Sequence, residues 1–224
     1  VEMDVNLSIT GDIALVSLDD GKKNAMTVDG LQKINAALDE ADEKAKAIVI
    51  AGRPGSFCAG FDLATMTGGE MDAIVTLGTN GGLLATRLYG LGKPLVAACT
   101  GHAFTIGAFW LLACDTRIGE TGNFKFGFNE TAMGMVLPPW GMELLKARIN
   151  PTLFLPTVTQ SRIYDPQGAV QAGILDSLVG EGESVEAAMQ IAAEFAALPA
   201  RAYAGNKLVP RAAALEIMRR DLGG

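Results

Sequence analysis

The side chain best suited to chemistry in this 224-residue sequence is Glu130, a carboxylate among residues that are almost wholly apolar. It lies in the stretch 94–141, which begins as a buried strand, turns at Gly101 and enters an apolar helix near Ile106. A second loop then delivers Glu130. An acid in such surroundings costs free energy unless it is hydrogen-bonded, bound to a metal or used in catalysis. We expect it to act as a general acid or base; the alternative is a carboxylate that caps a backbone turn.

Two glycine-rich loops follow predicted buried strands, at the strand ends where α/β folds tend to bind ligands. In the loop 52–63, Gly60 lets the backbone approach a ligand closely and leaves the amide of Phe61 free to point inward. In the second loop, Thr105 to Gly107 begin a helix, whose first amides have no intrahelical partner. Two such amides that converge form an oxyanion hole for a carbonyl oxygen. Two ordinary glycine-rich turns explain the same pattern equally well.

Other catalytic classes lack their motifs. His102 is the only histidine and no cluster has metal-ligand spacing, so we predict no metal site. No Gly-x-Ser-x-Gly elbow is present. The run from Gly90 to Lys93 is followed by Pro94, where a phosphate loop needs Ser or Thr. No Gly-x-Gly-x-x-Gly joins a strand to a helix, so no dinucleotide cofactor is expected. For His102 itself a structural role is favoured over a catalytic one.

Composition limits the partners and the compartment. The net charge of −7 disfavours a nucleic-acid surface, which needs a basic footprint. Hydrophobic residues at 49% and charged residues at 19% support a substantial core in one large domain, with or without a helical appendage. Cys58, Cys99 and Cys114 lie in apolar runs, which indicates buried free thiols in a reducing cytoplasm. We find no signal-peptide layout and no apolar run of about 18 residues, so we predict a soluble cytoplasmic protein without membrane contact.

Periodicity gives the expected elements. A hairpin is predicted over 5–18 around Gly11, followed by an amphipathic helix over 28–44 capped by Thr27. Further strands are predicted at 47–51, 94–99, 116–119 and 124–126. Helices are predicted at 64–91 (interrupted at the glycine pairs 68–69 and 81–82), 106–114, 141–148, 151–159, 165–172, 185–198 and 207–222. This order favours repeated β-β-α units followed by a helical C-terminal region.

Three motifs in register, SFCAGFDL, GHAFTIGAFWLLACDTRIG and FGFNETAMGMVLPPWG, resemble the crotonase (enoyl-CoA hydratase/isomerase) superfamily. The likeness extends from 13 to 179. It implies an α/β fold, a crotonase-like spiral of ββα units over 1–180, with a C-terminal helical region over 181–224. It also implies an acyl-CoA thioester substrate, no cofactor beyond the CoA of that substrate, and a homotrimer or a dimer of trimers. Since the sequence stops soon after the last predicted helix, we expect the helices that cover the acyl pocket in this family to be shortened.

The resemblance also assigns site residues. The oxyanion-hole amides correspond to Phe61 and to Ile106, where family members usually carry glycine, so the isoleucine side chain is expected to narrow the pocket. Asp115, and Asp62 as well, match positions that look structural rather than catalytic. The residues implied in substrate binding are Lys23, Asn24 and Ala25 at the nucleotide end, Ala59, Phe61, Asp62 and Leu63 along the adenine and pantetheine, and Phe109 and Trp140 in the apolar part. Lys22 or Lys23 can face a phosphate, although such a loop pair is more often merely solvated.

The carboxylates separate reactions within the family. The resemblance implies that hydratases of this family use two glutamates, one on the helix of the oxyanion hole and one on the following loop. The helix position is Phe109 here. The loop around Glu130 is similar to that of mitochondrial-type Δ3,Δ2-enoyl-CoA isomerases. Moving a double bond needs one base, which takes a proton from C2 and returns it at C4. We therefore predict an enoyl-CoA isomerase of the fatty-acid oxidation type. The alternatives are another crotonase reaction, by hydration or thioester hydrolysis through water, and a non-catalytic acyl-CoA-binding protein in which Ile106 blocks the acyl chain.

Overall fold

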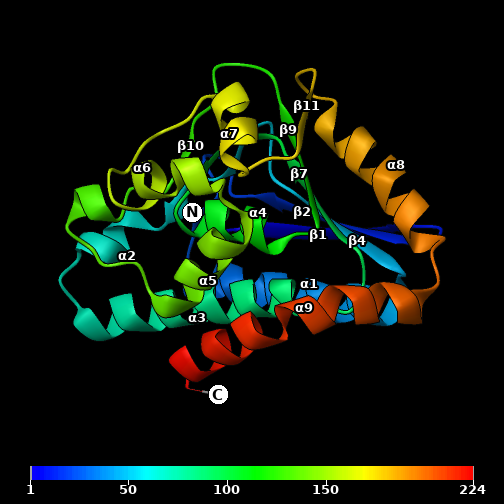
Figure 1. Cartoon of the computed structure of the whole chain (residues 1–224), viewed down its shortest axis with the longest axis horizontal. Helices are drawn as coiled ribbons and strands as arrows, with labels where there is room; N and C mark the ends of the chain where they lie inside the picture. The colour runs from blue at the N-terminus through cyan, green and yellow to red at the C-terminus, as the bar shows by residue number, and fades with distance from the viewer. Residues whose placement is uncertain (1, 224) are drawn as a thin grey trace.

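The computed structural model describes residues 2–223 and is built on a six-stranded sheet in the order β1-β2-β4-β7-β9-β11 (Figure 1). Its strands are β1 (Asp4–Thr10), β2 (Ile13–Asp19), β4 (Ala47–Ala51), β7 (Leu95–Cys99), β9 (Thr116–Glu120) and β11 (Ser177–Val179). The first two form the predicted antiparallel hairpin, which turns at Gly11 with φ +59°. The remaining pairs are parallel. Every residue of β4 and β7 is buried, because helices cover both faces of the sheet centre.

A second layer of short strands lies beside the large sheet. It contains the three-stranded sheet β10-β8-β5 and the pair β3-β6. The strands are β3 (Ala25–Met26), β5 (Gly55–Cys58), β6 (Gly60–Phe61), β8 (Gly101–Phe104) and β10 (Phe126–Gly127). The expectation of plain loops at 52–63 and of a simple turn at Gly101 is therefore wrong. A long strand, a short strand and a helix recur along the chain, which is the predicted repetition of ββα units.

The helices surround these two layers. They are α1 (Val28–Lys44), α2 (Leu63–Thr67), α3 (Met71–Tyr89), α4 (Ile106–Ala113), α5 (Pro139–Arg148), α6 (Phe154–Val158), α7 (Pro166–Ala172), α8 (Ser184–Ala196) and α9 (Ala200–Asp221), with 3-10 turns at Thr131–Met133 and Pro151–Leu153. Thr27 caps α1 as predicted, by accepting a hydrogen bond from the amide of Gly30. All eight residues of α4 are buried, since the helix is apolar on every side.

The two last helices cover different parts of the molecule. Ala188 and Ala192 of α8 pack on the sheet face formed by Val49, Val96 and their neighbours. Helix α9 packs against α3 and α5 and runs along the lower side of the view in Figure 1. It begins at Ala200, earlier than predicted, and contains Pro210.

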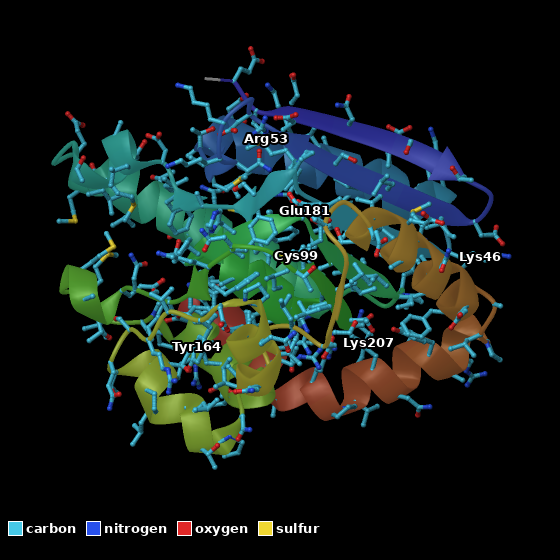
Figure 2. All side chains as sticks on the ribbon, turned by 90° about the horizontal axis from the view of Figure 1, so that it is seen from above. Lys46, Arg53, Cys99, Tyr164, Glu181 and Lys207 are labelled. Atoms are coloured by element: carbon cyan, nitrogen blue, oxygen red, sulfur yellow. The ribbon has the colours of Figure 1, made fainter. Side chains whose placement is uncertain are left out.

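Asp115 anchors α9 to the body, in the structural role expected for it. Its carboxylate accepts hydrogen bonds from Lys207 Nζ at 2.8 Å and from Arg211 Nη2 at 3.0 Å, both on α9, and from the amide of Leu95 at 2.9 Å. Figure 2 shows Lys207 on this helix. The hydroxyl of Tyr203, also on α9, donates to the same carboxylate at 2.9 Å. Because four donors meet one mostly buried carboxylate, α9 is fixed to β7.

The glycine pair 81–82 does not interrupt α3, contrary to expectation. A Cβ on Gly81 would stand 2.6 Å from the ring of Phe61, and one on Gly82 would stand 2.7 Å from Trp140 Nε1. The two glycines therefore serve close packing inside a continuous helix, and the Gly68-Gly69 pair alone separates α2 from α3.

The three cysteines are free and buried as predicted, and Figure 2 shows Cys99 in the interior. Within residues 2–223, no helix is both long and apolar enough to cross a bilayer. The same residues contain no group of three or more His, Cys, Asp or Glu side chains arranged to hold a metal ion.

Candidate active site

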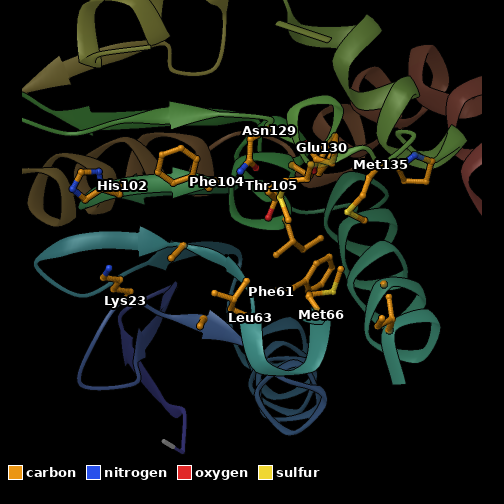
Figure 3. A pocket seen from close by; sticks show the side chains of 18 of the residues that line it. Lys23, Phe61, Leu63, Met66, His102, Phe104, Thr105, Asn129, Glu130 and Met135 are labelled. Atoms are coloured by element: carbon orange, nitrogen blue, oxygen red, sulfur yellow. The ribbon is translucent and has the colours of Figure 1, made fainter. Parts of the chain in front are cut away.

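A cavity of about 1130 Å³ lies between the short strands, α3, α4 and the loop around Glu130 (Figure 3). It brings together most of the residues that the sequence suggested: Lys23, Ala25, Ala59, Phe61, Leu63, Ile106, Phe109, Glu130 and Trp140. Asp62 does not line it. The carboxylate of Asp62 accepts hydrogen bonds from the amide and hydroxyl of Thr65, both at 2.9 Å, and so caps α2.

Glu130 is buried in the cavity wall with 8% of its surface exposed, and its Oε2 has no hydrogen-bond partner. Burial raises the pKa of its carboxyl from 4.5 to about 7, because removing water disfavours the charged form. The side chain does not cap the turn that follows, so the capping alternative fails. Its backbone is fixed, since Glu130 O accepts from the amide of Met135 at 2.8 Å and the hydroxyl of Thr131 donates to Val158 O at 2.8 Å.

The amide of Phe61 is directed by the pairing of β6 with β3. The neighbouring amide of Asp62 donates to Met26 O at 2.9 Å. Because successive amides of a strand point to opposite sides, the amide of Phe61 turns away from β3, and Phe61 itself lines the cavity. Gly60 makes this path possible with φ +106°, a conformation that side-chain-bearing residues rarely adopt.

The amide of Ile106 is the first of α4 and thus has no intrahelical acceptor. It is aimed by Thr105, which has φ +46° although it is β-branched. The amide of Thr105 donates to Gly127 O at 3.1 Å, which holds this turn against β10. The side chain of Ile106 borders the cavity and packs toward Gly81 of α3.

Aromatic rings form another part of the cavity wall. The ring of Phe109 is tilted against Phe128 at 4.8 Å and stands edge-on to Trp140 at 4.9 Å between centroids. Phe109 therefore occupies the position on α4 at which the helix glutamate of a hydratase is expected. Among the described residues that line the cavity, the other acid is Asp221, whose Oδ2 accepts from the amide of Trp140 at 3.1 Å.

The opposite end of the cavity is cationic. It is bordered by Lys22, Lys23, Arg53, His102 and Lys125. Figure 3 shows Lys23 and His102 well away from Glu130 and Met135. His102 Nδ1 accepts from the amide of Lys125 at 3.0 Å, which fixes the ring, and burial together with Lys125 and Lys23 lowers its pKa.

Asn24, expected at the nucleotide end, lies outside the cavity lining. It is fully buried, and its Nδ2 donates to the carbonyls of Leu18 and Phe57 at 2.9 and 3.1 Å. This side chain holds the loop that carries Lys23, because it ties the loop to both β2 and β5.

Further groups in the cavity were not predicted. The side chains of Thr105, in a loop already expected at the site, and of Asn129 have oxygens (Oγ1 and Oδ1) buried there without hydrogen-bond partners. Asp221 and Leu222 reach the cavity from the end of α9. The Asn129 side chain had a signal, since it adjoins Glu130. Asp221 and Leu222 had no signal in the sequence, because only the packing of α9 on α5 brings them to the cavity.

Comparison with known proteins agrees with this geometry. Residues 8–216 match the family model described as enoyl-CoA hydratase/isomerase. Human mitochondrial enoyl-CoA delta isomerase 1 is 27% identical over 205 residues, which cover 90% of this chain and 68% of that protein. The 2,3-dehydroadipyl-CoA hydratase of Escherichia coli K12 is 30% identical over 174 residues, 77% of this chain and 66% of its own length. A solved Mycobacterium tuberculosis enoyl-CoA isomerase superposes with a TM-score of 0.93 at 35% identity, covering 98% of this chain and 96% of the other.

Proposed function

The chain belongs to the enoyl-CoA hydratase/isomerase family, and we propose that within it the protein is a Δ3,Δ2-enoyl-CoA isomerase with Glu130 as its single acid–base group. The observation that carries the proposal is the setting of Glu130: a buried carboxyl with an unpaired oxygen, facing a cavity whose other acid is engaged by a backbone amide.

The substrate lies along the cavity in one direction. The phosphates of CoA fit the end that carries Lys22, Lys23 and Lys125, since an acidic protein needs such local cations to bind an anion. The acyl group then extends past Phe61 toward Phe109 and Trp140. The thioester carbonyl falls between the two ends, next to the amides of Phe61 and Ile106.

The reaction is a proton transfer between two carbons. Glu130 removes a proton from C2, and the electrons of that C–H bond move toward the thioester oxygen as a dienolate. The amides of Phe61 and Ile106 stabilise the negative oxygen, each by about 3–4 kcal/mol. The proton on Glu130 then returns at C4, the C2–C3 double bond forms, and the carboxylate is regenerated.

A pKa of about 7 suits both halves of this cycle. A base is most effective when its pKa lies near the working pH, because it is then deprotonated and still strongly basic. Burial gives Glu130 this property without a second titrating group, which supports a mechanism that uses one carboxyl group twice.

Hydration is the rival reaction, since some of the proteins similar to this chain are described as hydratases. It requires an activated water and a separate proton source. Phe109, with 2% of its surface exposed, occupies the position of the second carboxylate and packs with Trp140, so that this wall supports exclusion of water. Isomerisation is therefore the better supported reaction.

The test is an assay with trans-3-hexenoyl-CoA that separates three products: the 2-enoyl thioester, the 3-hydroxyacyl thioester and free CoA. We expect the 2-enoyl product, and a loss of about 10²–10⁴-fold in kcat for Glu130→Gln, with CoA binding retained. Accumulation of the hydroxyacyl product or of free CoA would replace the proposal by hydration or hydrolysis. Binding without turnover would indicate an acyl-CoA-binding protein. Light scattering on the same sample tests the expected homotrimer or dimer of trimers.

A further inference from the structure

Helix α3 contains three glycines that face different surroundings. Gly81 and Gly82 have no room for a side chain, since a Cβ on either would stand within 2.7 Å of Phe61 or Trp140. Gly78 is different: it lines the cavity, yet a Cβ built on it meets nothing within 4 Å. Packing therefore explains two of the glycines and leaves the third unexplained.

Glycine inside a helix is unfavourable, because it has more conformational freedom to lose than any other residue and is the weakest helix former after proline. At Gly78 neither a positive φ nor a close contact requires it. What glycine provides at this position is empty space on the cavity side of α3, one turn before the glycines that contact Phe61 and Trp140.

The cavity that Gly78 lines also has an exposed apolar rim. Several of its lining side chains have large exposed fractions: Leu63 65%, Val75 56%, Met133 48%, Met135 39% and Val136 92%. They come from α2, from α3 and from the segment 133–136, and Figure 3 shows Met135 directed at α3. Exposed apolar side chains that are continuous with a ligand cavity are typical of a binding surface.

We propose that Gly78 is a specificity-determining residue, which keeps open an exit between α3 and the segment 133–136 through which a long acyl chain leaves the cavity. This inference rests on the proposed function, because it takes the occupant to be the acyl group of the thioester. The substrate class is long-chain acyl-CoA: the part of the chain near the thioester is enclosed, and the distal methylenes lie on the apolar rim.

The experiment is a comparison of Gly78→Leu with Gly205→Leu. Gly205 is a second helix-interior glycine with nothing within 4 Å of its Cβ position, on the exposed side of α9 and outside the cavity lining. Both substitutions raise helix propensity equally, and only the first fills the exit. Calorimetric affinity for hexanoyl-CoA and dodecanoyl-CoA, each below its micelle concentration, is measured beside kcat/KM for trans-3-hexenoyl-CoA and trans-3-dodecenoyl-CoA.

We expect wild type to bind and convert the twelve-carbon ligands at least as well as the six-carbon ones. Gly78→Leu should lower the affinity and kcat/KM for the twelve-carbon ligands about tenfold relative to the six-carbon ones, and Gly205→Leu should leave both ratios unchanged. Gly78→Ala should shift the ratios in the same direction by less, which keeps the test valid if the leucine variant folds poorly.

The binding arm separates this inference from the proposed function. A falling affinity ratio in Gly78→Leu without turnover of any 3-enoyl thioester would leave the exit supported and the isomerase disproved. Normal turnover in Gly78→Leu with an unchanged ratio of twelve-carbon to six-carbon affinity would overturn the proposal of an exit. Wild-type binding that weakens sharply from six to twelve carbons would also overturn it.

Discussion

The first turn of α4 lies in backbone contact with the strand that leads to Phe61: a Cβ on Gly107 would stand 2.6 Å from the carbonyl oxygen of Cys58. Ile106 directly precedes Gly107 and Phe61 lies three residues after Cys58, so we expect this contact to set how close their two amides come. The separation of the two proposed oxyanion donors therefore depends on a residue that contributes no side chain.

Gly107→Ala should separate these donors, because backbone atoms of Cys58 cannot yield as a flexible side chain does. We expect kcat/KM for isomerisation to fall about 10²-fold, which corresponds to the loss of one donor. Overpacking should also lower the free energy of unfolding by about 1–3 kcal/mol. Gly205→Ala, with open space at its Cβ, is the matched control. Wild-type turnover in Gly107→Ala would show that the contact does not set the donor geometry.

The pH dependence of activity should follow Glu130. With its pKa raised to about 7, the base form of this carboxyl is lost as the pH falls below neutrality. We expect kcat/KM to drop about tenfold per pH unit below pH 7 and to level off above it. A profile that stays flat down to pH 5.5 would mean that the carboxyl keeps an ordinary pKa, and the single-base mechanism would lose its physical basis.

The same shift predicts a stability difference with a definite sign. Between the unfolded pKa of 4.5 and the folded value of about 7, the folded protein holds a proton on Glu130 that the unfolded chain has lost. Wild-type stability therefore decreases as the pH rises through this window, by about 3 kcal/mol in total. Glu130→Gln removes this term, so it should gain stability relative to wild type at pH 8 compared with pH 4.5. Urea unfolding at both pH values measures it, and Glu181→Gln, at an exposed position, should show no such difference.

The sequence was informative where local chemistry decides the structure. The bounds of α1 follow from the Thr27 cap and the apolar spacing, and Glu130 was recognisable as an acid among apolar residues. The two-residue strand β6 was not predicted, and the strand expected at 124–126 is found as β10 at Phe126–Gly127. Both exist through pairing with distant segments rather than through an alternating pattern.

Polar residues near the site were the least predictable. Asn24 and Asp62 adjoin cavity residues in sequence, but their side chains satisfy backbone groups instead. The positive φ of Thr105 had no sequence signal either, because glycine is the residue that normally marks such a conformation. These positions depend on tertiary hydrogen bonds that periodicity and composition do not report.

Phe109 should control the partition between isomerisation and hydration. Phe109→Ala leaves a gap beside Trp140, in the cavity that Glu130 also lines, and water can enter it. The fraction of 3-hydroxyacyl-CoA among the products should therefore rise as the isomerisation rate falls. The unfolding free energy should decrease by about 3–5 kcal/mol. Leu111→Ala, in the same helix and fully buried but outside the cavity lining, should lose stability without changing the products. An unchanged product ratio in Phe109→Ala would show that this ring does not exclude water.

Lys23 should contribute to CoA binding and leave the chemical step unaffected. It lies at the cationic end of the cavity, away from Glu130, where its ammonium can contact a phosphate (Figure 3). Because the side chain is exposed, we expect Lys23→Ala to raise the KM for trans-3-hexenoyl-CoA only about two- to fivefold, with kcat unchanged. Added salt should reduce this difference, since it screens exposed charges.

The same acyl group on N-acetylcysteamine carries no phosphate, so its kinetics should be identical in Lys23→Ala and wild type. Lys46→Ala, at an exposed lysine paired with Asp12 outside the cavity, is the control and should change neither substrate. An equal KM increase with the phosphate-free thioester would mean that Lys23 supports the loop and does not bind CoA.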